Sequence, residues 1–214
     1  MNTELNTLAD VVRTQASLNA ALGAGTVFGE VGERVAARVT GSQRISGTGN
    51  DLMRPAPSGW KRPAVEGLVG GPSGVTRRGA LDVIDERAHA RYDKWVARGE
   101  LQLGEVKTRQ LDRRYDPETQ LLDTRSEGPT STFCPFVDFY VFVVFGLDGL
   151  IKKCFEVSRT DLLDYVASDV GRGGRWNYKI SIGLWTNVGL DHTRAAQGAL
   201  CDLEAVPESK MRNV

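Results

Sequence analysis

The chain has 214 residues, of which 41% are hydrophobic, 25% are charged and 7% are aromatic. These fractions allow one compact domain with a sizeable core, and they exclude a collagen, a coiled coil, a wholly disordered chain and a disulfide-rich miniprotein. The 27 basic and 27 acidic side chains cancel, so bulk charge gives no argument for binding to nucleic acid or membranes.

Three features of the sequence bear on the cellular compartment. The longest apolar stretch, residues 137–145, has about half the length that a membrane-spanning helix needs. Residues 1–25 lack the cationic start and following apolar run of a secretory signal. The cysteines, Cys134, Cys154 and Cys201, form no CxxC pair. We therefore expect no membrane segment and a reducing, cytoplasmic location.

The N-terminal part of the chain predicts two helices followed by an irregular segment. Apolar side chains recur at helical spacing over residues 5–22 and again over residues 27–40, which predicts two amphipathic helices. Residues 40–79 then carry nine glycines and four prolines with almost no periodicity. This composition predicts a long irregular loop, because such a stretch cannot bury much apolar surface by itself.

The remainder predicts mainly strands. Residues 90–97 and 100–109 are typical of strands, and Arg98-Gly99 between them suits a tight hairpin turn. Residues 137–145 are apolar on both faces, as a central strand is. Further expected elements are a strand over 150–157, a helix from a cap at Thr160 through Val166, a strand over 178–185 and a helix over 191–200. This order indicates one α/β (α+β) domain over residues 1–214, with a mixed sheet.

The predicted hairpin carries residues that can do chemistry. Asp93 lies on its first strand, and Glu105 and Lys107 lie two residues apart on its second, so these two side chains project from the same face. Two carboxylates can hold Mg²⁺, which keeps waters for a reaction. An ammonium group can orient such a water or stabilise negative charge that develops on a phosphate. The arrangement suits phosphodiester hydrolysis, although a solvated Glu–Lys pair on a strand is the simpler interpretation.

The segments RYDKWVARGELQLGEVKTR and FVDFYVFVVFG resemble the core of the PD-(D/E)xK nuclease superfamily, particularly the type II restriction endonucleases. The resemblance implies a restriction-endonuclease-like mixed β-sheet flanked by helices. It also implies that Asp93 and Glu105 bind Mg²⁺ and that Lys107 is a further catalytic residue. The helix GEVGERVAARV is similar to the helix that precedes the first catalytic strand in this family, which implies Glu33 as an additional catalytic residue.

Two departures from the family pattern leave the first carboxylate open. Tyr92 stands where the family has proline before the aspartate, and residues 40–79 separate the helix from the hairpin more widely than is usual. Asp51 and Asp82 are therefore alternatives to Asp93.

The resemblance further implies that the substrate is double-stranded DNA and that the protein is a homodimer, because one site per subunit cuts one strand. Candidate DNA-binding residues are Arg77, Arg78, Arg109, Arg172 and Arg175. We expect the basic segment 40–79 to engage DNA and not to join the core. The sequence thus predicts a Mg²⁺-dependent endonuclease of a restriction system. A repair or phage-type nuclease of the same fold and a non-catalytic DNA-binding protein are the alternatives.

Overall fold

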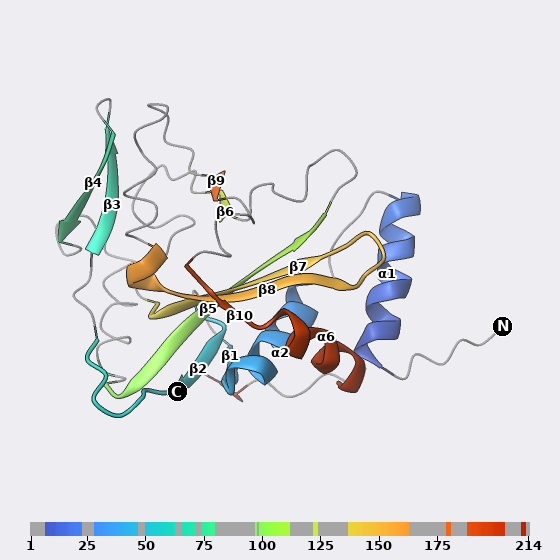
Figure 1. Cartoon of the computed structure of the whole chain (residues 1–214), viewed down its shortest axis with the longest axis horizontal. Coiled ribbons are helices and arrows are strands. Elements are labelled where there is room, and N and C mark those ends of the chain that lie inside the picture. The colour runs from blue at the N-terminus through green and yellow to red at the C-terminus, as the bar shows by residue number, and fades with distance from the viewer. Residues whose placement is uncertain are drawn as a thin grey trace.

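The structure is a computed structural model of the whole chain (Figure 1). It describes residues 7–22, 28–46, 50–62, 66–71, 74–79, 97, 99–111, 122–123, 137–162, 179–180, 188–203 and 211–212. The helices are α1 (Leu8–Leu22), α2 (Phe28–Thr40) and α6 (Thr193–Asp202). The strands are β1 (Gln43–Ser46), β2 (Leu52–Pro55), β3 (Glu66–Gly71), β4 (Gly74–Gly79), β5 (Leu101–Gln110), β6 (Leu122–Asp123), β7 (Phe139–Phe145), β8 (Ile151–Ser158), β9 (Lys179–Ile180), β10 (Leu190–Asp191) and β11 (Met211–Arg212).

The main sheet has seven strands in the order β10-β8-β7-β5-β2-β1-β11. Strand β5 runs parallel to β7, and β1 runs parallel to β11, whereas the other neighbouring strands are antiparallel. Strands β3 and β4 form a separate hairpin, and β6 pairs with β9. The described residues therefore build a mixed sheet flanked by helices, which confirms the α/β class predicted from the sequence.

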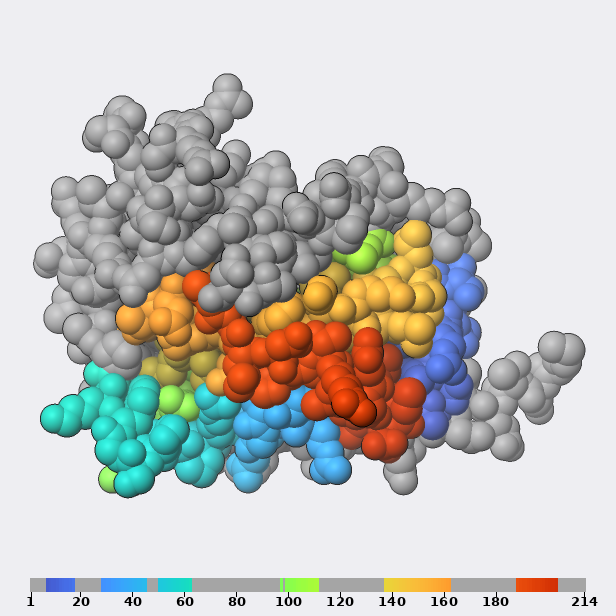
Figure 2. Space-filling view, viewed as in Figure 1, coloured from blue at the N-terminus to red at the C-terminus, as the bar shows by residue number. Residues whose placement is uncertain are grey.

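The core lies between one face of this sheet and the three helices. Helix α6 packs against β8 and α2, as the space-filling view shows (Figure 2). Every residue of β7 is buried, which confirms the prediction of a central strand, and alternate side chains of this strand (Val141, Val143 and Phe145) belong to the core. Helix α2 approaches the sheet closely at Gly32, where a Cβ atom would lie 2.0 Å from Cγ2 of Thr108.

Helix α1, helix α2, helix α6 and strand β8 also agree with the sequence predictions, within a few residues at their ends. The helix expected from a cap at Thr160 starts one residue earlier, at Arg159. Its cap is Ser158, whose Oγ accepts a hydrogen bond from the backbone N–H of Asp161 at 3.0 Å and donates one to the Asp161 carboxylate at 2.7 Å. No helix in the described part of the chain is long and apolar enough to cross a membrane.

The prediction of an irregular loop over residues 40–79 is wrong for much of its length. Strands β1, β2, β3 and β4 all lie within it. Ile45 is 4% exposed and Leu52 is fully buried, so this segment does contribute to the core. Strands of four residues are too short for an alternating pattern to stand out, and pairing with β5, a neighbour distant in sequence, stabilises β2 in spite of its proline.

The predicted hairpin of residues 90–97 with residues 100–109 is also corrected. Strand β5 confirms the second strand, but its neighbours in the sheet are β2 and β7. Ala97 has a helical backbone, and residues 90–96 lie outside the described residues. Gly99 does lie in a turn, with a φ of 49°. A turn residue does not determine which strands pair, however, so the turn was not evidence for a hairpin.

One ion pair ties β2 to β8 at the edge of the core. Arg54 directs Nη2 and Nη1 at the two carboxylate oxygens of Glu156, at 2.5 and 3.1 Å, and its Nε donates to Gln102 at 2.8 Å. Its guanidinium lies 4.1 Å above the ring of Phe139. Burial alone would raise the pKa of Glu156, but hydrogen bonds from His192 and Arg54 outweigh it and lower the pKa to about 2. The cluster is therefore a half-buried, well-bonded strand connection.

We expect Arg54→Met to lower the free energy of unfolding by about 1–3 kcal/mol, because it leaves Glu156 half-buried without its strongest partner. The loss should shrink as the pH falls from 4.5, the ordinary pKa of Glu156, to about 2, where the folded-state carboxylate is protonated. Urea unfolding at several pH values measures this. The control is Lys152→Met, which breaks an exposed pair with Asp148 and should cost less than about 0.5 kcal/mol. Equal losses in the two variants would contradict the prediction.

Candidate active site

The site lies where β2 and β5 separate. The pairing of these two strands ends at Leu52 and Gly104. Just before Leu52, the backbone N–H of Asp51 donates to the Gly104 carbonyl at 2.9 Å, and Oδ2 of Asp51 accepts from the backbone N–H of Val106 at 2.8 Å. The side chain of Asp51 thus takes the place of a backbone acceptor on a strand that continues without β2. Glu105, the residue between Gly104 and Val106, is close enough for its charge to act on Asp51.

Glu105 and Lys107 lie on one face of β5, as the strand period requires. Lys107 Nζ donates to Oε1 of Glu105 at 2.6 Å. The second carboxylate oxygen of Glu105, Oε2, is buried and has no hydrogen-bond partner among the described residues. An acceptor that is buried without a partner costs free energy, so a cation or a donor bound to this oxygen would be stabilising.

Helix α2 brings a third carboxylate to the same place. Its Glu33 is half-buried, with 18% of the side chain exposed, and accepts from Nη2 of Arg44 on β1 at 3.3 Å. Arg44 itself is 4% exposed and also binds Glu30 of the same helix at 2.5 Å. The Arg44 interaction fixes the helix end that carries Glu33 to the strand that neighbours β2.

Burial and crowding of charge set the protonation of Asp51. Removal from water and the nearby carboxylate of Glu105 raise its pKa to about 7, with a smaller contribution from Glu33. The hydrogen bond from Val106 and the charge of Lys107 oppose this shift and do not overcome it. The charges of Glu105, Glu33 and Lys107 therefore all act on Asp51.

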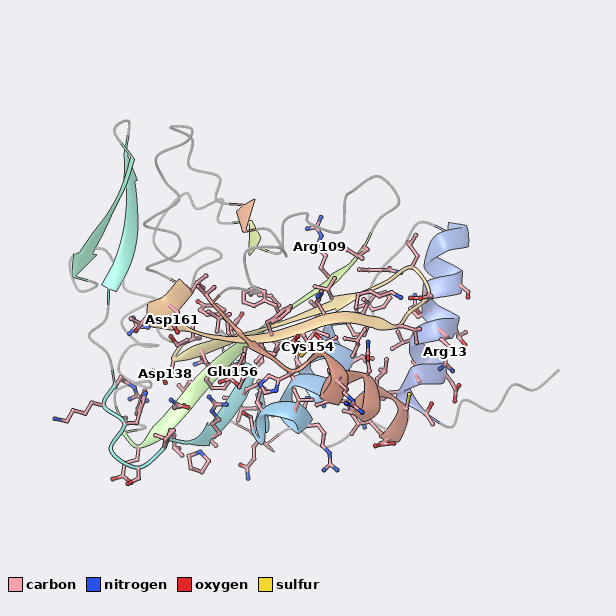
Figure 3. All side chains as sticks on the ribbon, viewed as in Figure 1. Arg13, Arg109, Asp138, Cys154, Glu156 and Asp161 are labelled. Atoms are coloured by element: carbon pink, nitrogen blue, oxygen red, sulfur yellow. The ribbon has the colours of Figure 1, made fainter. Side chains whose placement is uncertain are left out.

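The structure describes some of the site residues predicted from the sequence and not others. Of the three candidates for the first carboxylate, Asp51 lies in the described part of the chain, and Glu105, Lys107 and Glu33 all affect its pKa. Asp93, Asp82, Arg172 and Arg175 lie outside the described residues, and for Arg77 and Arg78 only the backbone of β4 is described. Arg109 is half-buried on β5, on the same face as Glu105 and Lys107, and lies toward the opposite end of that strand from Asp138 (Figure 3).

Asp138 serves the sheet and not the site. Its Oδ2 accepts from the backbone N–H of Leu103 at 2.9 Å, and its Oδ1 lies 3.4 Å from Nε of Arg62. Asp138 is therefore a polar residue at the strand end that bonds the neighbouring strand. Arg44, Arg54 and Arg62, which contribute to the basic character of segment 40–79, each bind acidic side chains of the protein itself. That segment therefore offers fewer cations to DNA than its composition indicates.

Two of the carboxylates fit a divalent cation. Among the described residues, no group of three His, Cys, Asp or Glu side chains is close enough to hold a metal ion. Mg²⁺ needs fewer, since one or two carboxylates suffice when waters and a phosphate complete its shell. The unpartnered Oε2 of Glu105 and the raised pKa of Asp51 are both features that a bound cation would relieve. Asp51 and Glu105 are thus the pair with the right chemistry for Mg²⁺.

Sequence reasoning missed Arg44. Its partners, Glu30 and Glu33, are 14 and 11 residues away on a separate element, and no local spacing rule connects a strand residue to a helix over that distance. Comparison with known proteins adds no family, because the chain matches no family model and no curated protein sequence.

The raised pKa of Asp51 gives a test of the site that needs no activity. Below about pH 4 the carboxyl is protonated in both the folded and the unfolded chain. Between pH 4 and 7 the folded chain holds the proton that the unfolded chain has lost, so stability falls as the pH rises. We expect Asp51→Asn, which keeps an acceptor for Val106, to be more stable than the wild type at pH 8 by about 1–3 kcal/mol, with the gain gone at pH 4.

Urea unfolding at pH 4, 6 and 8 in the presence of a chelator measures this difference. The control is Asp202→Asn at the exposed end of α6, which should show no such dependence. A gain for Asp51→Asn that is the same at pH 4 and pH 8 would contradict the assignment.

Proposed function

We propose that the protein is a metal-dependent DNA endonuclease with a restriction-endonuclease-like core, and that Asp51, Glu105 and Lys107 form its catalytic site. The observation that carries this proposal is the meeting of an aspartate from the end of β2 with the Glu-x-Lys triplet of β5, where Val106 bonds Asp51 at 2.8 Å. The PD-(D/E)xK resemblance implies this order: an aspartate on one strand, followed by an acidic residue and a lysine on the next strand of the sheet. In this proposal Asp51 takes the role first considered for Asp93.

The chain order around the site supports the proposal. Helix α2 with Glu33 comes first. Strand β2 then pairs antiparallel with both β1 and β5. The apolar strand β7 lies parallel to β5 on its other side. A restriction-endonuclease-like site has four parts by this resemblance. They are a helix glutamate, a carboxylate on one strand, the Glu-x-Lys triplet on the next strand and a buried strand beyond it.

In the proposed reaction each residue has a separate task. Asp51 and Glu105 would hold Mg²⁺, which supplies Lewis acidity and a water of lowered pKa when bound. Lys107, already within hydrogen-bond distance of Glu105, carries the ammonium that orients the attacking water or offsets the negative charge on the phosphate. Glu33 adds negative charge behind Asp51 and is an accessory residue. Hydrolysis then needs no covalent intermediate with the protein.

The proposed substrate is double-stranded DNA, and cutting both strands implies a homodimer with one site in each subunit. The candidate DNA contacts remain Arg77, Arg78, Arg109, Arg172 and Arg175. A cytoplasmic restriction system is the proposed setting, and a repair or phage-type nuclease would use the same site. A DNA-binding protein without catalysis is the second candidate, which the lack of a third close metal ligand among the described residues favours. Incubation with plasmid and phage DNA in Mg²⁺, followed by sequencing of the fragment ends, tests the proposal.

Matched variants decide which aspartate acts. We expect Asp51→Asn to reduce plasmid cleavage by at least about a hundredfold and Lys107→Ala by a similar or larger factor, because each removes a group that acts on the transition state. Asp93→Asn should retain activity within a few fold. Cleavage rates at saturating Mg²⁺ measure this, with circular dichroism to check folding. The opposite order, with Asp93→Asn inactive and Asp51→Asn active, would restore Asp93 as the first carboxylate.

Metal exchange separates binding from cleavage. Mg²⁺ should support cleavage, whereas Ca²⁺ should support DNA binding with little cleavage, because Ca²⁺ prefers looser and higher coordination. Gel-shift and plasmid assays in parallel with Mg²⁺, Ca²⁺ or a chelator measure the two steps. Equal cleavage in Mg²⁺ and in the chelator would remove the metal mechanism, and DNA binding without cleavage in any metal would favour the non-catalytic candidate.

A further inference from the structure

Arg44 is a buried cation near the site. It lies on β1 opposite Leu52, the residue that follows Asp51, and only 4% of its side chain is exposed. Its Nη2 binds Glu30 at 2.5 Å and Glu33 at 3.3 Å. Its Nε and Nη1 have no hydrogen-bond partner among the described residues.

This arrangement is costly for a residue that only holds a helix to a strand. Burying a guanidinium is unfavourable unless it is well paired. Here Nη2 makes both contacts with glutamate, while Nε and Nη1 bond none of the described residues. An apolar side chain at this position, beside Leu52 and facing α2, would fill the same space without an unpaired donor. The charge of Arg44 therefore serves a purpose besides packing.

The neighbouring carboxylates indicate that purpose. Glu33 lies near enough to Asp51 for its charge to act on that residue. Lys107 binds Glu105, the other carboxylate that acts on Asp51. Each of these two carboxylates thus contacts a cation, whereas among the described residues Asp51 accepts its hydrogen bond from the backbone of Val106.

We propose that Arg44 is a positioning residue, which holds the Glu33 carboxylate beside Asp51 and offsets its charge so that a divalent cation binds Asp51 and Glu105 but not Glu33. This inference rests on the proposed function for the cation site, but the Arg44–Glu33 coupling does not depend on a metal. Removal of Arg44 would leave three carboxylates around the cation site with one guanidinium fewer. The site would then bind divalent cations more tightly and in larger number.

The first experiment measures the coupling in the protein without metal. Melting temperatures are compared at pH 8 in a chelator for the wild type, Arg44→Met, Glu33→Gln and the double variant. Arg44→Met should lower the melting temperature by several degrees, and by less than half as much in the Glu33→Gln background, because the repulsion between Glu33 and Asp51 is then absent. An equal loss in both backgrounds means that Arg44 only packs, and overturns the proposal.

The second experiment uses Mn²⁺ alone as the probe and counts bound ions by electron paramagnetic resonance. Wild type should bind one Mn²⁺ per chain. Arg44→Met should bind Mn²⁺ about tenfold more tightly, or bind a second ion, because the charge of Glu33 is no longer offset. The double variant and Arg44→Lys should both return to within about threefold of wild type, the first by removing the Glu33 charge and the second by restoring the cation. The matched control, Glu30→Gln, should leave Mn²⁺ binding unchanged.

The outcomes separate this inference from the proposed function. If the wild type and the Arg44→Met variant bind Mn²⁺ with equal affinity, the role of Arg44 is overturned and the metal site stands. Tighter binding that persists in the double variant also overturns it, since Arg44 then does not act through Glu33. A wild type that binds no Mn²⁺ overturns both the metal mechanism and the cation part of this inference.

Discussion

The hydrogen bond from the Val106 N–H to Oδ2 of Asp51 is the contact on which the site depends. At this point β2 leaves β5, and the backbone donors of β5 on that side need other acceptors. A carboxylate supplies one, so a single side chain both completes the edge of a central strand and stands beside Glu105. A residue without a side-chain acceptor would leave a buried N–H group unbonded, and the strand would lose the separation that makes room for the site.

The two faces of the sheet at β5 carry different kinds of side chain. Leu52, Val106 and Phe139 point toward α1, α2 and α6 and belong to the core. Glu105 and Lys107 alternate with these residues and therefore lie on the opposite face. Because the period of a strand is fixed at two, a shift of one residue in the register of β5 would bury this charged pair in the core. The apolar packing of Val106 therefore also maintains the orientation of Glu105 and Lys107 next to it.

The elements that the sequence predicted correctly are those whose apolar pattern is visible within the element itself. The helices over residues 28–40 and 193–202 and the strand over residues 139–145 have an apolar period or run that needs no knowledge of the rest of the chain. The four-residue strands β1 and β2 have none, and they are strands because of their neighbours. For the same reason the Glu-x-Lys triplet could be found from the sequence, whereas the position of Asp51 beside it required knowing that β2 is the strand next to β5.

Repulsion between carboxylates at the site lowers the free energy of unfolding. Asp51 is a buried carboxyl with two further carboxylates near it and a pKa of about 7, so at neutral pH ionisation of this group opposes folding. Lys107 and Arg44 reduce the repulsion by holding Glu105 and Glu33, whereas the bond to Asp51 comes from the backbone of Val106. The large buried side chains of β7 offset that cost elsewhere in the sheet. Such a local conflict between charges, next to a well-packed strand, is typical of functional sites and agrees with the cation site that we propose.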